Sequence, residues 1–307
     1  WAPRMDLWSI AQKTRASLPG EFKDLNTVEI AEALGVGCHA VRGDVTLLRK
    51  PGSLALRGLG FDNHPDYPYT VTPGNLLVNY EMKDDVHSTL IKTSHGDVSF
   101  QFKQTAEMRT AGISLPFILK YPVQTVHDLD AVAEVFEDLR ITPTPDAYAR
   151  FHHRVGDSGV AVASGCIAAS PMHLLLHELV AMDTFFYLYH DAPGEMRKFC
   201  SRLEPFFESL LDASLACKAE AVFWGANFDR DLTWPPFFES EIRPWLKRVS
   251  QKLHSAGKLL ICHTDGENSG LLELYRGCGF DVGESVCPSP MTSLALSEVR
   301  KGMGDGI

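Results

Sequence analysis

The sequence contains no apolar run of about 18 residues, so it offers no candidate transmembrane helix. It has no long cluster of Lys and Arg either, and its formal net charge of −10 argues against a nucleic-acid partner. Residues 1–6 do not lead from a charged region into an apolar one, as a signal peptide does. We therefore expect a cytoplasmic protein that binds neither a membrane nor nucleic acid.

No CxxC pair occurs among the seven cysteines, which are dispersed singly along the chain. An odd, scattered set in a chain of 307 residues indicates reduced thiols rather than a disulfide framework. Low-complexity tracts are also absent. With 45% hydrophobic and 22% charged residues, the composition is typical of a globular enzyme.

Apolar runs of strand length alternate with amphipathic helical segments along most of the chain. The six runs that we interpret as strands are 1–7, 38–41, 160–164, 221–224, 258–263 and 280–284. Continuous apolar strands that alternate with helices indicate a parallel sheet buried on both faces. We therefore predict an α/β fold, a (β/α)8 TIM barrel that forms a single domain over residues 1–307.

Between about residue 45 and residue 102 the pattern changes to alternating apolar and polar residues. The stretches 88–93 and 97–102 lie on either side of turn residues, which predicts an antiparallel β-hairpin inserted in the barrel. The chain begins without Met and stops at Ile307, where we expect a further strand to start. We therefore expect a fragment of a longer protein, with a barrel that is C-terminally incomplete.

Polar residues end the fifth and sixth apolar runs, the position where catalytic residues collect in a parallel barrel. His263 and Asp265 follow the fifth run, and Glu284 ends the sixth, with Cys287 shortly after it. Because about one strand–helix repeat separates His263 from Glu284, we expect the two side chains to lie side by side. An imidazole, a carboxylate and a thiol match the ligand preferences of zinc. The structural alternative is a hydrogen-bonded His, an Asp-Gly turn and a buried thiol.

Other side chains are expected at the same rim, where they either bind substrate or pair with one another. These candidate substrate-binding residues are Asp6, Trp8, Trp224, Asn227 and Asp229. The two tryptophans could stack on an aromatic ring. His173 and His177 have the spacing of metal ligands on a helix, but the leucines around them favour a packing role.

Three segments carry a resemblance to a known family. Tyr189-His-Asp-Ala-Pro193, within residues 185–196, resembles the helix and Asp-Pro stretch of uroporphyrinogen decarboxylase relatives. Gly225-Ala-Asn-Phe-Asp229, followed by Trp234-Pro-Pro-Phe-Phe and Ile242-Arg-Pro-Trp, resembles a second segment of that family. His263-Thr-Asp-Gly falls where the family has a histidine–glycine strand end. The resemblance covers nearly the whole chain and implies the TIM barrel of the uroporphyrinogen decarboxylase type.

The first segment separates two branches of this family. The decarboxylases carry Arg-Gln-Ala-Gly-Arg after the first strand, and its arginines hold the carboxylates of the substrate. Here the corresponding segment is Pro3-Arg-Met-Asp-Leu-Trp8, in which one arginine remains beside a carboxylate and an indole. A polyanionic substrate would meet repulsion there. The chain therefore resembles the zinc-dependent, corrinoid-linked methyltransferase branch.

This branch implies a metal site and a reaction. His263 and Glu284 match its histidine and glutamate, Asp265 stands in place of its first cysteine, and Cys287 is an additional thiol. The implied ligands are thus His263, Glu284 and Cys287, and the implied catalytic residues are His263, Asp265 and Glu284. A partner protein would supply the corrinoid, because the chain has no Asp-x-His-x-x-Gly cobalamin motif.

The harder ligand Asp265 favours an oxygen substrate over a thiol, so we predict O-demethylation of a methoxylated aromatic. Two alternatives remain open at this point. One is a uroporphyrinogen decarboxylase-like lyase, in which His263 and Asp265 act as general acid and base without a metal. The other is a non-catalytic barrel that binds a small molecule through Asn227 and Asp229.

Overall fold

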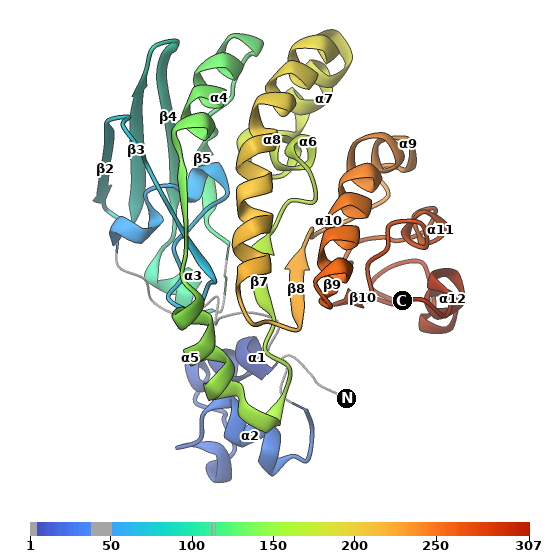
Figure 1. The fold of residues 1–307 in the computed structure, drawn as a ribbon. Coiled ribbons are helices and arrows are strands. Elements are labelled where there is room, and N and C mark those ends of the chain that lie inside the picture. The colour runs from blue at the N-terminus through green and yellow to red at the C-terminus, as the bar shows by residue number, and fades with distance from the viewer. Residues whose placement is uncertain (1–4, 38–50, 112, 114) are drawn as a thin grey trace.

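A central parallel sheet organises the computed structural model, which describes residues 5–37, 51–111, 113 and 115–307. Its strands are β7 (Ala163–Cys166), β8 (Ala221–Trp224), β9 (Leu259–His263) and β10 (Val282–Glu284). They lie in the order β10-β9-β8-β7, and every neighbouring pair is parallel (Figure 1). The last four apolar runs of the sequence overlap these strands, so the prediction of a parallel sheet with mixed α/β architecture is confirmed.

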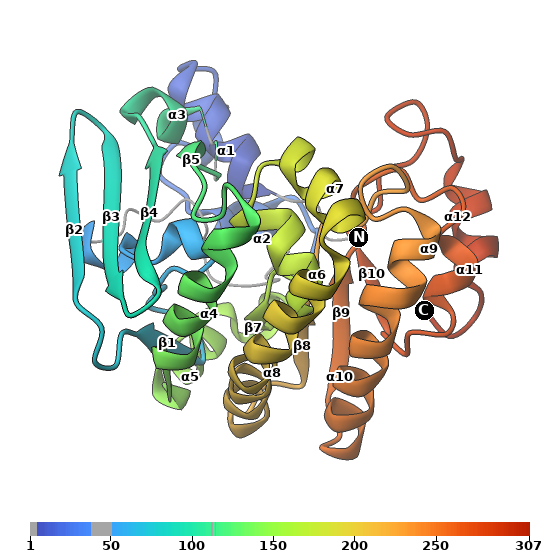
Figure 2. The same cartoon turned by 90° about the horizontal axis from the view of Figure 1, so that it is seen from above.

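Amphipathic helices connect the parallel strands and cover the sheet. The long connections contain α8 (Pro193–Ala216) between β7 and β8, and α10 (Arg243–Ser255) between β8 and β9. Leu203, Phe207 and Leu210 recur at helical spacing in α8 and are fully buried. Together with α4 (Leu129–Asp138), the two helices form a layer along one side of the molecule (Figure 2).

Shorter helical segments complete these connections. They are α6 (Pro171–Leu174), the π-helical turn η6 (Leu175–Leu179), α7 (Met182–Asp191), α9 (Pro235–Phe237), the π-helical turn η7 (Phe238–Ile242), α11 (Leu272–Tyr275) and α12 (Leu296–Met303). None of the described helices is both long and apolar enough to cross a bilayer.

The N-terminal part of the chain is helical. It contains α1 (Met5–Thr14), η1 (Gly20–Phe22), α2 (Thr27–Ala33), η2 (Pro51–Leu54) and η3 (Arg57–Leu59). The strand predicted for residues 1–7 is therefore wrong from Met5 onward, because a short apolar run fits a helix as well as a strand. The strand predicted for residues 38–41 lies outside the described residues.

An antiparallel sheet lies at the opposite end of the molecule from α11 and α12 (Figure 1). Its strands are β2 (Val78–Lys83), β3 (Val86–Thr93), β4 (Gly96–Lys103) and β5 (Phe117–Lys120), in that order. Thr93 pairs with Gly96, whose φ of +126° allows the tight turn, so the predicted hairpin is confirmed.

The remaining elements join the two sheets. They are α3 (Ala106–Thr110), η4 (Val126–Asp128), β6 (Arg140–Pro143), α5 (Pro145–Val155), η5 (Gly156–Ser158) and β1 (Tyr69–Thr72), which pairs antiparallel with β6. The parallel sheet has four strands in the described part of the chain and does not close on itself. Closure into a TIM barrel therefore stays a prediction.

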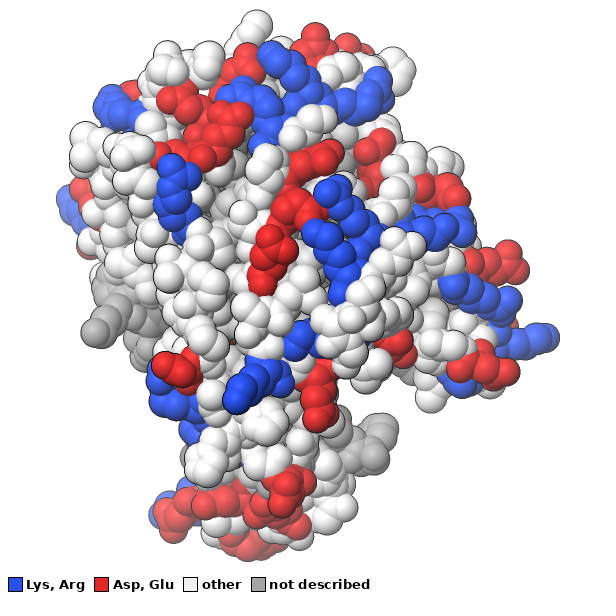
Figure 3. Space-filling view, viewed as in Figure 1, with Lys and Arg blue, Asp and Glu red and all other residues white. Residues whose placement is uncertain are grey.

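Charges of both signs share the face drawn in Figure 3. Acidic side chains lie beside basic ones over α8 and α10, where Glu208 of α8 forms ion pairs with Arg248 and Lys252 of α10. These pairs hold together two helices of the covering layer rather than presenting a field of one sign.

Candidate functional site

The carboxyl ends of the parallel strands meet in one row. His263 at the end of β9 is opposite Glu284 at the end of β10. The amide of His263 donates to the Gly225 carbonyl, 3.0 Å away, in the loop after β8. Cys166 ends β7 opposite Trp224. Residues from four strand ends therefore line one edge, and parallel α/β sheets bind their ligands at this edge.

His263 lies between two carboxylates. Its Nδ1 forms a hydrogen bond with Glu284, and its Nε2 lies 3.2 Å from Oδ2 of Asp265. The side chains of His263 and Glu284 are mostly buried, whereas that of Asp265 is 39% exposed. Burial opposes the charge on the imidazole, but the hydrogen bonds and negative charges of Asp265 and Glu284 outweigh it and raise the pKa of His263 to about 9. The expected side-by-side placement of His263 and Glu284 is present.

Cys287 follows these residues in a loop, and it is itself half-buried. Its Sγ lies 3.6 Å from the carbonyl oxygen of Ser285. Burial raises the pKa of the Cys287 thiol, and the nearby negative charge of Asp265 raises it further. The Cys287 thiol is thus within electrostatic range of the Asp265 carboxylate.

The donor set has the chemistry of a zinc site but is not preformed around an ion. Imidazole, carboxylate and thiol are all zinc ligands. Across the residues that the structure describes, no group of three or more His, Cys, Asp and Glu side chains is arranged to hold a metal. The Nε2–Oδ2 separation of 3.2 Å between His263 and Asp265 is close to the ~3.3 Å expected between two ligands of one tetrahedral zinc. A hydrogen-bonded ion pair has this separation too, so the sequence-based ligand set of His263, Glu284 and Cys287 stays a prediction.

Asp229 links the loops that follow β8 and β9. Its carboxylate accepts hydrogen bonds from the amides of Asp231, at 2.8 Å, and Glu267, at 2.9 Å. The amide of Arg230 also donates to the carbonyl of Glu267 at 2.8 Å. The carboxylate of Asp229 is thus used in a structural tie between two strand-end loops.

The structure does not bring every predicted rim residue to this edge. Trp224 is fully buried, and its indole N–H donates to the carbonyl of Ala169, so the structure places it in the core. Trp8 is half-buried in α1. Asp6 also belongs to α1, and its side chain lies outside the described part.

A polar chain that the sequence analysis did not predict reaches the same edge. Arg57 of η3 donates to Oε2 of Glu178 at 2.6 Å, and Oε1 of Glu178 contacts Nδ1 of His177 at 2.8 Å. Nε2 of His177 lies 2.6 Å from Nδ2 of Asn227, in the loop after β8. Burial alone would raise the pKa of Glu178, but the Arg57 guanidinium and the hydrogen bond with His177 lower it to about 2.

The two histidines of this helical segment have different environments. Nδ1 of His173 accepts a hydrogen bond from the amide of Ala169, and its ring packs beside Phe228. Burial lowers the pKa of His173 well below its usual value. The predicted packing role therefore applies to His173, whereas His177 has polar partners at both ring nitrogens. The sequence did contain a signal for this polar chain. The adjacent residues His177 and Glu178 follow a strand end and lie inside an apolar segment, where a buried carboxylate needs a hydrogen-bonding or charged partner.

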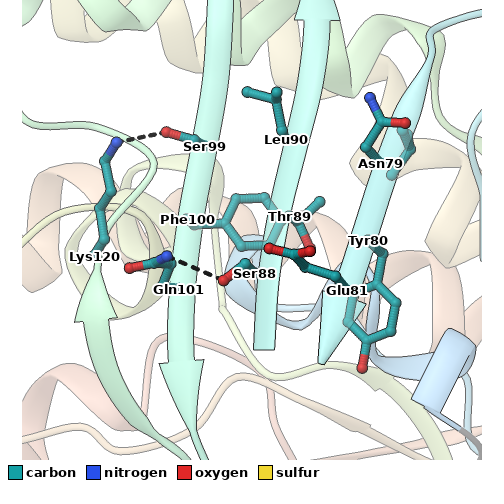
Figure 4. Close-up of a pocket in the computed structure, with 11 residues that line it drawn as sticks. Asn79, Tyr80, Glu81, Ser88, Thr89, Leu90, Ser99, Phe100, Gln101 and Lys120 are labelled. Atoms are coloured by element: carbon teal, nitrogen blue, oxygen red, sulfur yellow. Dashed lines mark hydrogen bonds between the residues drawn. The ribbon is translucent and has the colours of Figure 1, made fainter. Parts of the chain in front are cut away.

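A separate hollow of about 690 Å³ lies over the antiparallel sheet (Figure 4). Its polar lining includes Asn79, Glu81, Ser99 and Lys120. Hydrogen bonds join Lys120 to Ser99 and Gln101 to Ser88. The lining contains neither imidazole nor thiol, so we place the candidate site at the ends of the parallel strands instead.

Comparison with known proteins gives little further guidance. No protein-family model and no curated protein sequence matches the chain. A solved methyltransferase from Methanosarcina mazei aligns with 62% of this chain and 53% of its own chain, at 14% identity and a TM-score of 0.39. The present chain thus spans about half the length of that protein.

Proposed function

We propose that this chain is an enzyme that moves a methyl group between a small substrate, a methoxylated aromatic, and a corrinoid held by a partner protein. The observation that carries the proposal is the contact of His263 with both Glu284 and Asp265 at the carboxyl edge of the parallel sheet. The resemblance of these strand-end residues to those of corrinoid-linked methyltransferases supports the choice of reaction.

In this proposal, zinc is held on the Nε2 side of the His263 ring. Nδ1 is engaged by Glu284, and a carboxylate on the second ring nitrogen is the usual way in which a protein orients a metal-binding histidine. Asp265 is already at the separation of a second ligand. The loop thiol of Cys287 is the third candidate, and metal binding would require it to lose its proton.

The chain's own residues then perform three tasks. Glu284 orients the imidazole, Asp265 supplies a hard oxygen ligand, and Asn227 binds the substrate through the oxygen of its side-chain amide. Zinc bound there would polarise the methoxy oxygen of the substrate, which favours loss of its methyl group. An oxygen ligand in place of a thiolate suits an oxygen substrate.

Elemental mass spectrometry after zinc reconstitution tests the metal site. We expect about one zinc per chain in the wild type, loss of zinc in His263→Ala and Asp265→Asn, and weaker retention in Glu284→Gln. Substitution of the exposed His190, which pairs with Asp191 at 2.7 Å, is the matched control and should retain the metal. Absence of zinc from the wild type contradicts the metal site.

A turnover assay tests the reaction. The wild type is mixed with a methoxylated aromatic and a reduced corrinoid protein, and formation of the methylated corrinoid is followed by absorbance. The phenolic product should appear in equal amount, and His263→Ala should abolish both signals. Phenol formation without methylation of the corrinoid would contradict methyl transfer.

The same contacts also favour an acid–base lyase as a second candidate. An imidazole that is hydrogen-bonded to two carboxylates can hold and deliver a proton without a metal. Activity that survives exhaustive chelation but not the His263→Ala substitution would select this candidate over the first.

A further inference from the structure

The hydrogen-bond chain from Arg57 to Asn227 begins in the core and ends at the strand-end loop. The side chains of Arg57, Glu178 and His177 are 12%, 5% and 16% exposed. Such a buried ion pair is a poor source of stability, because its desolvation cancels most of its attraction. The pair also depends on η6, a π-helical turn, and such turns occur frequently at functional sites. These features indicate a positioning role rather than a stabilising one.

The contacts of His177 determine which ring nitrogen carries its proton. Glu178 is an ionised carboxylate and can only accept hydrogen bonds, so Nδ1 of His177 must be the donor. In the neutral ring, Nε2 is then an acceptor. The atom 2.6 Å from Nε2 must therefore be a donor, and Nδ2 of Asn227 is in that place. Glu178 thus fixes the tautomer of His177, and His177 fixes the orientation of the Asn227 amide.

This orientation leaves the carbonyl oxygen of Asn227 turned away from His177. Within the described part of the chain, Oδ1 of Asn227 accepts no hydrogen bond, in contrast to its engaged Nδ2. The backbone of Asn227 has a φ of +57°, a left-handed conformation that asparagine adopts more readily than other residues with a side chain. Two residues earlier, the carbonyl of Gly225 holds the amide of His263. Oδ1 is therefore a fixed acceptor in the loop next to the proposed active site.

We propose that Arg57, Glu178 and His177 are positioning residues that fix Asn227 as a hydrogen-bond acceptor for a hydroxyl group of the substrate or product. A phenolic hydroxyl has this chemistry. The inference rests on the proposed location of the site, and it requires neither zinc nor methyl transfer. In this inference Asn227 determines the specificity for a hydroxyl-bearing ligand. The three supporting residues are not among the proposed metal ligands.

Imidazole NMR of protein labelled with ¹⁵N-histidine tests the tautomer. The His177→Gln variant identifies the signals of His177. In the wild type near neutral pH we expect a protonated Nδ1 and an unprotonated Nε2. In Asn227→Asp, where a carboxylate faces Nε2, we expect both nitrogens to be protonated. The exposed His190 should be unaffected by that substitution. A wild-type His177 with its proton on Nε2 overturns the inference.

Binding of phenol and anisole tests the ligand chemistry, because these two probes differ in whether the ring oxygen carries a hydrogen. Ligand-observed NMR titrations are made on metal-free protein without a corrinoid. We expect the wild type to bind phenol roughly threefold to tenfold more tightly than anisole, the effect of one hydrogen bond. His177→Phe and Asn227→Leu should remove this preference without weakening the binding of anisole.

Two further variants separate positioning from damage to the fold. The double variant Arg57→Met/Glu178→Gln removes the buried charges but retains an oxygen that accepts from Nδ1, so the preference should survive. Asn79→Leu, in the hollow over the antiparallel sheet, is the matched control and should leave the preference unchanged. Equal binding of phenol and anisole by the wild type overturns the inference, and so does a preference that persists in His177→Phe. Failure of zinc binding or turnover affects only the proposed function.

Discussion

Two His–Glu pairs lie at the same edge of the parallel sheet, and they differ in how their charge is balanced. In the first pair, Glu178 lies between Arg57 and His177, so a guanidinium neutralises the carboxylate. All three side chains are largely buried. An enclosed arrangement in which the carboxylate is balanced by a guanidinium suits a fixed support.

The second pair contains more negative charge than its imidazole can neutralise. His263 contacts the carboxylates of Glu284 and Asp265, one of which is more than a third exposed. The two carboxylates raise the pKa of His263 to about 9, and an excess of negative charge remains even when the imidazole is protonated. A divalent cation could take the place of that proton, which suits a centre where a metal or substrate arrives. The same residue types thus serve two tasks, because their surroundings differ.

The largest effect is expected from Arg57→Met, which leaves the Glu178 carboxylate buried without its guanidinium. Breaking a buried pair in this way costs about 3–5 kcal/mol in the free energy of unfolding. Urea denaturation measures the loss. Lys92→Met, at an ion pair whose members are half exposed, should cost less than about 1 kcal/mol. Equal losses of unfolding free energy in the two variants would mean that burial of the Arg57–Glu178 pair does not matter.

The second-largest effect is expected from acid, which should lower the stability contributed by Glu178 in the first pair. The pKa of Glu178 falls from 4.5 to about 2 on folding, so its contribution to stability is complete above pH 4.5 and is lost as the pH falls toward 2. The unfolding free energies of the wild type and of Glu178→Gln should therefore converge over this range. A difference that stays constant with pH would show that Glu178 titrates normally.

Removing the charge of Glu284 should affect metal affinity rather than the fold. In Glu284→Gln the amide oxygen can still accept from Nδ1 of His263, so the ring keeps its orientation but becomes less basic. We expect zinc affinity to fall roughly 10- to 100-fold, measured by competition with a chromogenic chelator. Complete loss of zinc would instead indicate that Glu284 binds the metal directly, as the sequence analysis predicts.

The smallest effect is expected from His190→Ala. His190 and Asp191 form a third His–carboxylate pair, but their side chains are 88% and 70% exposed. Solvent screening should hold the change in unfolding free energy below about 0.5 kcal/mol, again by urea denaturation. A larger loss would mean that burial is not what separates the three pairs.

The sequence predicted the parallel strands and part of the site for a physical reason. Continuous apolar runs identified the buried strands, and consecutive parallel strands bring their last residues to one edge, so His263 and Glu284 could be paired in advance. The contact between Arg57 and Glu178 spans 121 residues and connects two segments without a strand pattern, so no local periodicity revealed it. Trp224 was expected at the rim but is buried, because the last residue of a strand can face a covering helix as well as the open edge.

The tie between the two strand-end loops has a consequence for engineering. The loop after β8 is bound to Glu267 in the loop after β9 by two hydrogen bonds: the Asp229 carboxylate accepts from the Glu267 amide, and the Arg230 amide donates to the Glu267 carbonyl. A Cβ on Gly266 would lie 2.4 Å from the carbonyl oxygen of Phe228, so there is no room for a side chain between the loops. Transplanting either loop alone into a related scaffold would leave its polar backbone groups without partners. The two loops form a single exchangeable cassette.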